Sequence, residues 1–160
     1  MVKKRGKRPQ GFERRIVMKK NVLRKAIDIG RKSGHIFLIT ADQSGIPHMS
    51  IATKISIASE TQIWVAGWFC PGTVENLENN PNIGVAVWDE TNDTGYQLLG
   101  RKQELNAIAI TDGYSPELEE EPSLPQIERE VKIVIEKMLG FKQAPHADVE
   151  EEWNQTLMVV

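Results

Sequence analysis

Residues 45–57 read GIPHMSIATKISI, and this stretch contains the clearest strand pattern in the chain. From position 48 to position 57, large apolar side chains alternate with small or polar ones. Successive side chains of a strand point to opposite faces of a sheet, so we expect one set to face a core. The inward set is Met49, Ile51, Thr53, Ile55 and Ile57. The outward set is His48, Ser50, Ala52, Lys54 and Ser56.

Four more stretches rich in β-branched and aromatic residues predict strands around this one. They cover residues 35–41, 62–69, 82–88 and 96–110. Residues 42–45 form a turn in which Gly45 is available for a positive φ. Within the last strand, Gly100 is expected to mark a bulge.

A short helix and two longer ones complete the prediction. The short helix opens at Pro71-Gly72-Thr73 and ends at Asn79-Asn80-Pro81. Apolar periodicity predicts the longer helices at residues 18–32 and 126–139. Their apolar faces are Met18, Val22, Leu23, Ala26 and Ile27 in the first, and Ile127, Val131, Val134, Ile135 and Met138 in the second. Gly140 closes the second helix.

The remaining segments are an acidic surface loop at 111–125, an irregular stretch at 142–152 and a last strand at 153–160. Strands at short spacing, with one short inserted helix, indicate a small barrel and not a parallel α/β sheet. The predicted fold is mainly β. It has six antiparallel strands in a small closed or split barrel, with an N-terminal and a C-terminal helix.

The chain has 160 residues with a net charge of −2, enough for one domain, which we place at residues 18–160. Residues 1–17 form a basic arm, either a solvated tail or a segment for an anionic surface. Nucleic acid binding is not expected, because no recognition motif follows the charges. No apolar run is long enough for a membrane span, and the single Cys70 suits a reducing compartment, so we expect a cytoplasmic protein.

The outward face of the strand at 48–57 is unusual for a solvent-exposed surface, because it has small residues beside one lysine, Lys54. Gly84 and Ala86 are expected on the same outer surface. Such a surface suits a planar ring, a partner subunit or plain solvent. The helix start at 71–73 favours an anion, and Thr73 either caps that helix or donates to a phosphate.

The order of several segments resembles the pyridoxamine 5′-phosphate oxidase-like FMN-binding split-barrel superfamily. The resemblance covers roughly residues 34–110 and rests on GIPH (45–48), the strand through Lys54, IWVAG (63–67), TVENLENNP (73–81) and GYQLLG (95–100). It implies a six-stranded antiparallel split β-barrel of the FMN-binding type, and a homodimer with FMN in a groove between the subunits. By position, Ser50, Ile51, Ala52, Thr53 and Lys54 would flank the ring and ribityl chain. Gly67 and Trp68 would lie near the ring, and Gly72, Thr73 and Asn76 near the phosphate.

The chain departs from the family at two places. Many members have a lysine or arginine just before the threonine, where this chain has Gly72, so Lys54 is expected to balance the phosphate. The arginine-and-histidine substrate signature of the oxidase is missing from residues 153–160, so pyridoxamine phosphate oxidation is not expected. The resemblance implies an FMN-dependent oxidoreductase or electron-transfer protein with a small-molecule electron donor and acceptor. The alternative is a barrel dimer without enzymatic activity that binds no cofactor, or binds haem or a deazaflavin.

Cys70 and the three histidines are the remaining candidates for a catalytic, redox or metal-binding role. A thiol before a helix start can be a nucleophile or redox sensor, although a buried, inert cysteine is the simpler interpretation. None of His35, His48 and His146 has metal-ligand spacing, so no metal site is predicted. No catalytic acid or base is assigned, because flavin chemistry can proceed without one from the protein.

Overall fold

The computed structural model describes the backbone of residues 10–111 and 126–152 and the side chains of residues 22–109 and 126–152. Within these residues the chain forms two helices and one antiparallel sheet of eight strands. The elements, in chain order, are α1 (Gln10–Ser33), β1 (Ile36–Ala41), β2 (Pro47–Ala52), β3 (Lys54–Ile57), β4 (Gln62–Trp68), α2 (Pro71–Asn79), β5 (Asn82–Asp89), β6 (Thr94–Thr111), β7 (Gln126–Phe141) and β8 (Val149–Glu150).

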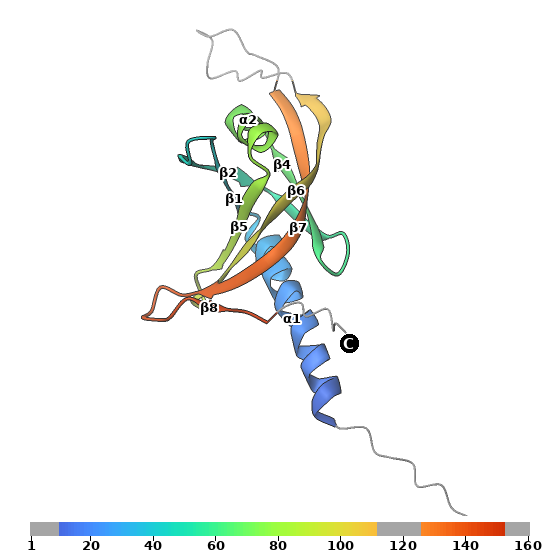
Figure 1. Ribbon diagram of the computed structural model, residues 1–160, viewed down its shortest axis with the longest axis vertical. Coiled ribbons are helices and arrows are strands. Elements are labelled where there is room, and N and C mark those ends of the chain that lie inside the picture. The colour runs from blue at the N-terminus through green and yellow to red at the C-terminus, as the bar shows by residue number, and fades with distance from the viewer. Residues whose placement is uncertain (1–9, 112–125, 153–160) are drawn as a thin grey trace, which may run out of the picture.

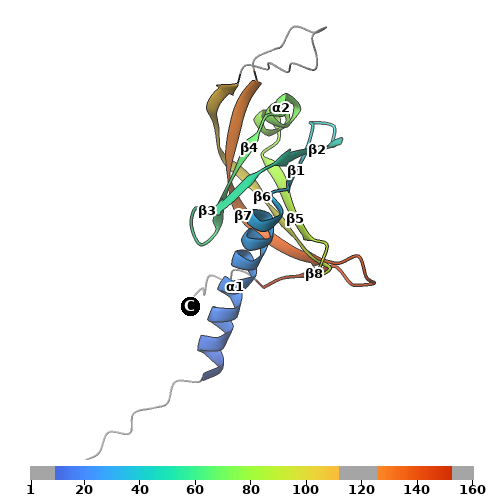
Figure 2. The ribbon, with the colours of Figure 1, turned by 180° about the vertical axis from the view of Figure 1, so that it is seen from behind.

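The sheet has the strand order β2-β1-β5-β6-β7-β4-β3, with β8 paired to β7. The strands at the two ends of this order, β2 and β3, follow each other in the chain and are separated only by Thr53. The sheet therefore curls until its ends approach each other, as Figures 1 and 2 show. The chain itself makes this junction, without a ladder between β2 and β3. The architecture is a split β-barrel with flanking helices.

The barrel interior is filled by aliphatic side chains, since alternate residues of each strand face inward. Helix α1 packs the buried Leu23, Ala26 and Ile27 against β3 and β5. The N-terminal half of α1 extends away from the barrel (Figure 1). The buried apolar strand residues are Ile36, Leu38, Ala52, Ile55, Ile63, Val65, Trp68, Ile83, Val85, Val87, Tyr96, Leu98, Val131, Ile133, Ile135 and Met138.

Several predictions for the middle of the chain are confirmed. Strands β4, β5 and β6 lie within two residues of the predicted bounds, and α2 has the predicted bounds. The bulge at Gly100 is present, because the ladder to β7 shifts register between Leu99 and Gly100. A Cβ on Gly100 would overlap the carbonyl oxygen of Val134, so a residue without a side chain is required at this contact.

The predicted C-terminal helix at 126–139 is wrong, because this segment is the long strand β7. It pairs with β6 on one side and with β4 on the other, so its backbone groups are satisfied within the sheet. The inward residues Val131, Ile133 and Ile135 alternate, and a register shift then places Met138 inside. Gly140, the predicted helix end, pairs with Tyr96. The described residues therefore contain eight strands where six were predicted.

The predicted orientation of β2 is also wrong. Met49 and Ile51 point outward, with 60% and 50% of their surfaces exposed, while Ala52 is buried. Beyond the break at Thr53 the pattern shifts by one residue, so Ile55 faces the core as predicted. One irregular residue between two strands is enough to move all later side chains to the opposite face.

The ends of the chain agree less closely with the prediction. Helix α1 begins at Gln10, eight residues before the predicted start, so part of the predicted arm is helical. The predicted loop at 111–125 and strand at 153–160 lie outside the described residues, apart from Thr111. The stretch 142–152 contains the short strand β8. Across residues 10–111 and 126–152, no helix is both long and apolar enough to cross a membrane.

Candidate functional site

The outer surface of β2, β1 and β5 is apolar, although it faces away from the core. The ladders place Met49 beside Ile39, and Ile39 beside Gly84. In the next row Ile51 pairs with Phe37, and Phe37 with Ala86. We call these six residues the outer apolar face: Phe37, Ile39, Met49, Ile51, Gly84 and Ala86. The small residues Gly84 and Ala86 were predicted here, but Ser50 and Ala52 point inward instead.

A sharp corner lies at the end of this face, where the chain leaves β2 and enters β3. The Thr53 N–H donates to the Ala66 carbonyl at 3.2 Å, so the chain passes from pairing with β1 to pairing with β4. Gly67 has a φ of +75°, and a Cβ on it would overlap Thr53 Oγ1. The predicted residues Thr53 and Gly67 therefore meet at the corner. The exposed Lys54 follows directly, and its Nζ lies 3.9 Å from Glu128 Oε1.

A second group of predicted residues meets between β2 and the start of α2. Thr73 is fully buried, and its Oγ1 lies 2.8 Å from Ser50 Oγ in a hydrogen bond. Asn76 Nδ2 donates to Thr40 Oγ1 at 3.0 Å. These hydrogen bonds hold α2 against the first two strands. The hydroxyl of Thr73 and the amide of Asn76 thus already have partners within the protein.

His48 and Cys70 approach each other beside this group, a contact that the sequence did not indicate. Cys70 Sγ lies 3.7 Å from His48 Nε2, although 22 positions separate them in the chain. A Cβ on Gly72 would lie 3.3 Å from the same nitrogen, so Gly72 leaves room for the imidazole. His48 Nδ1 is buried and has no hydrogen-bond partner among the described residues. Strand pairing brings this histidine to the helix start, and no sequence spacing encodes that.

Two predicted site residues belong to the core. Ala52 is fully buried, and Trp68 is only 1% exposed, with its Nε1 donating to the Val65 carbonyl. The indole of Trp68 therefore cannot contact a ligand on the outer surface. The other predicted residues fall into two places. Ile51, Thr53, Lys54 and Gly67 lie on the outer apolar face or its corner, and Ser50, Gly72, Thr73 and Asn76 lie at α2.

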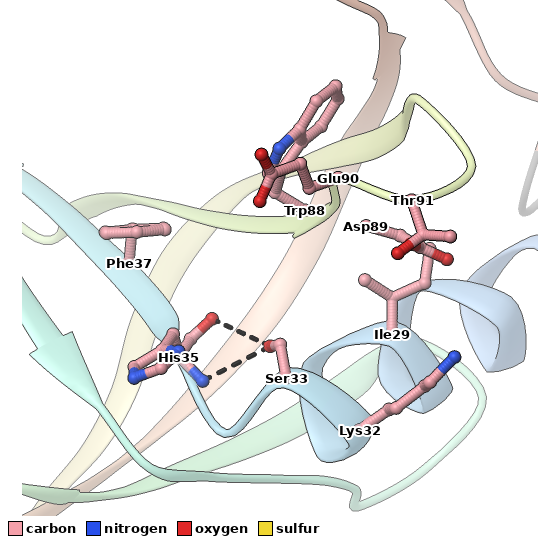
Figure 3. Close-up of a pocket in the computed structure, with 9 residues that line it drawn as sticks. All are labelled: Ile29, Lys32, Ser33, His35, Phe37, Trp88, Asp89, Glu90 and Thr91. Atoms are coloured by element: carbon pink, nitrogen blue, oxygen red, sulfur yellow. Dashed lines mark hydrogen bonds between the residues drawn. The ribbon is translucent and has the colours of Figure 1, made fainter.

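A pocket of about 370 Å³ lies beside Phe37, between the end of α1 and the turn after β5 (Figure 3). Its wall includes the ring of Trp88, which also stacks on Phe141 with a centroid separation of 5.2 Å. Ser33 Oγ bonds to both the N–H and the carbonyl of His35, which fixes the start of β1 here (Figure 3). The outer apolar face thus continues into an aromatic pocket. Its lining is Ile29, Lys32, Ser33, His35, Phe37, Trp88, Asp89, Glu90 and Thr91.

A cavity of about 500 Å³ lies on the other side of α2, facing the start of β7. Arg129 enters its wall from β7, and Cys70 from the residue before α2. The sequence pattern did not indicate Arg129, because it fell in the predicted helix. No group of three or more potential metal ligands occurs in the part of the chain that the structure describes.

Sequence comparisons give no match to a family model and no match to a curated protein. Structure comparison does give matches. The chain is similar to an FMN-binding protein from Syntrophomonas wolfei, with a TM-score of 0.56, 15% identity and coverage of 84% of this chain and 95% of that one. A Clostridium acetobutylicum protein of the pyridoxinephosphate oxidase family, related to general stress protein 26, has a TM-score of 0.56, 14% identity and coverage of 82% and 95%.

HupZ of Group A Streptococcus is a third structural neighbour, with a TM-score of 0.53, 16% identity and coverage of 78% of this chain and 97% of that one. All three likenesses extend over nearly the whole of the compared protein. The chain therefore has the split-barrel fold of pyridoxamine 5′-phosphate oxidase-like FMN-binding proteins.

Proposed function

We propose that this protein binds FMN as a homodimer and acts as a flavin-dependent oxidoreductase or electron carrier. The observation that carries the proposal is the outer apolar face, on which Met49 and Ile51 are exposed over 60% and 50% of their surfaces. Its electron donor and acceptor would be small molecules, and its single cysteine agrees with a cytoplasmic location. Pyridoxamine phosphate oxidation is not proposed.

We infer the dimer because leaving the outer apolar face in contact with water is unfavourable. Contiguous exposed apolar surface is rare on monomers and marks an interaction site. A two-fold axis through the outer apolar face would bury Met49 and Ile51 against the same residues of a second copy. The half-buried Phe37 and Ile39 of the same face pair with Ile51 and Met49 and extend the surface available for contact.

The flavin ring fits the edge of this face. Ala86 is partly exposed and has only a methyl side chain, so a planar ring can lie against β5 beside it, whereas Gly84 is buried next to Ile39 and Leu99. The pocket at Trp88 and Phe37 offers further aromatic contact beside it (Figure 3). When bound, the isoalloxazine supplies the redox chemistry, and the protein supplies binding and orientation. The neighbour from Syntrophomonas wolfei, itself an FMN-binding protein, favours FMN over a cofactor-free barrel.

The residues predicted to bind the phosphate of FMN offer it few charges and few free hydrogen-bond donors. Gly72 carries no charge, and the hydroxyl of Thr73 is bonded to Ser50. Lys54 is the one cation among them, and its side chain is 74% exposed and close to Glu128. The start of α2 has no acidic residue in its first turn, so no carboxylate of this turn opposes an anion at the positive end of the helix.

The test is a titration of the flavin-free protein with FMN and with riboflavin, followed by visible absorbance and by light scattering. We expect a dimer that binds both flavins, with FMN the tighter ligand. Lys54→Ala should weaken FMN by at most about fivefold, since an exposed charge pair contributes at most about 1 kcal/mol. Lys25→Ala, an exposed lysine on α1, is the control. A protein that binds neither flavin at micromolar concentration would contradict the proposal.

A further inference from the structure

The cavity of about 500 Å³ between α2 and β7 combines a cation with apolar walls. Phe69, Val74 and Ile127 provide the apolar surface, and Arg129 provides the cation. Phe69 lines the cavity and is 39% exposed, so this part of the cavity wall reaches the solvent. The remaining lining residues are Cys70, Pro71 and Gln126.

Arg129 is half-buried, and its side chain has no hydrogen bond or ion pair to any described residue. The neighbouring carboxylates on β7 do not pair with the guanidinium of Arg129. Glu128 lies near Lys54, and Glu130 accepts a hydrogen bond from Asn106 at 3.1 Å. A guanidinium stays charged at every physiological pH, and partial burial of a charge is costly unless an opposite charge meets it. An anion in the cavity would supply that partner.

The start of α2 adds to the positive potential of the cavity. Cys70 is the N-cap residue, makes no side-chain cap hydrogen bond and lines the cavity together with Pro71. Pro71 has no N–H, and Gly72 and Thr73 are not among the residues that line the cavity, so the helix acts through its dipole, which favours an anion at this end. No acidic residue in the first turn of α2 competes for this position.

We propose that this cavity binds a small organic anion whose charged head meets Arg129 and whose apolar part lies against Phe69, Val74 and Ile127. A guanidinium forms bidentate hydrogen bonds with phosphate and carboxylate groups, which fixes the position of the head. The charged head that meets Arg129 could be the phosphate of FMN or the phosphate of a separate organic ligand. In the first case, Arg129 replaces the cation that is missing at Gly72.

Phenyl phosphate is a suitable probe, because it has a dianionic head and one aromatic ring. Calorimetric titration of the full-length, flavin-free protein should show binding at one site per chain. Arg129→Gln should weaken it by about 10- to 100-fold, the loss expected for a charge-assisted pair. Arg129→Lys should recover part of the affinity. The matched control is Arg101→Gln, an exposed arginine on β6 that should leave binding unchanged.

Val74→Glu provides a second variant, because it introduces a carboxylate into the cavity wall without removing the arginine. It should abolish phenyl phosphate binding while the melting temperature shows that the protein still folds. Equal binding by the parent protein, Arg129→Gln and Val74→Glu would overturn the proposal, as would the absence of binding by the parent at millimolar concentration.

Saturating FMN distinguishes the two sources of the anion. Competition with phenyl phosphate would identify the head group as the cofactor phosphate, and simultaneous binding would identify a separate ligand. The result does not depend on the proposed function. A protein that binds phenyl phosphate through Arg129 but binds no flavin would refute the flavoprotein proposal and retain the anion site.

Discussion

Ser50 Oγ and Thr73 Oγ1 are 2.8 Å apart, and their hydrogen bond joins β2 to the first turn of α2. Thr73 is completely buried. Thr73→Val keeps the volume of the side chain but leaves Ser50 without this partner. We expect a loss of about 1–2 kcal/mol in the free energy of unfolding, measured by urea denaturation.

A double-mutant cycle separates this hydrogen bond from other effects. Ser50→Ala combined with Thr73→Val should show a coupling energy of about 0.5–1.5 kcal/mol. If the Thr73 hydroxyl serves mainly a bound phosphate, the result will be different. FMN affinity will then fall in Thr73→Val while the stability of the flavin-free protein stays unchanged.

The geometry of the corner at Thr53 predicts that the stability of the fold depends strongly on Gly67. Gly67→Ala places a methyl group on a residue with φ of +75° and in overlap with Thr53 Oγ1. Gly45→Ala is the matched control, because Gly45 has φ of +81° but no atom within 4 Å of the added Cβ. We expect about 1 kcal/mol of destabilisation at Gly45 from the backbone alone, and at least about 2 kcal/mol more at Gly67.

Thr53→Ala should rescue part of the loss in Gly67→Ala, because it removes the overlapping oxygen. Equal destabilisation of Gly67→Ala and Gly45→Ala in urea denaturation would show that the corner does not have this geometry.

The proposed dimer predicts that a charge on the outer apolar face prevents assembly. Ile51→Lys should give a monomer by light scattering, because burying an unpaired charge costs about 3–5 kcal/mol. The control is Ile57→Lys, which changes another exposed isoleucine at the end of β3. A dimer that persists in Ile51→Lys would place the interface elsewhere on the molecule.

The hydrogen bonds to the carboxylate of Asp93 predict that this group contributes to stability in a pH-dependent way. The backbone N–H groups of Gln143 and Ala144 donate to its carboxylate at 2.6 and 3.1 Å and hold its pKa below the usual value. A folded pKa below the unfolded value of about 3.9 stabilises the protein above that pH, and the contribution is lost as the pH falls through the folded pKa.

Asp93→Asn should therefore lower the melting temperature at neutral pH, and the difference from the parent protein should shrink below about pH 4. Asp28→Asn, an exposed aspartate of α1, is the control. A difference between parent and Asp93→Asn that stays constant from neutral to acid pH would exclude a contribution from the charged carboxylate.

The sequence predicted the part of the site that depends on local structure. Proline at the start of α2 and the Asn79-Asn80-Pro81 end define that helix, and it has the predicted bounds. The sequence could not predict which side chains contact one another around α2. The contact of His48 with Cys70 joins residues 22 positions apart, and it exists because β2 lies against the start of α2.

The sequence by itself determined the central strands β4, β5 and β6, the helix α2 and the small-barrel class, because alternation and turn residues act over a few positions. Only the tertiary structure decided that β7 is a strand. Its apolar residues fit a helical face as well as an alternating one, and hydrogen bonds to β4 and β6 select the strand. The tertiary structure also decided which face of β2 is outside, because the break at Thr53 shifts the alternation by one residue.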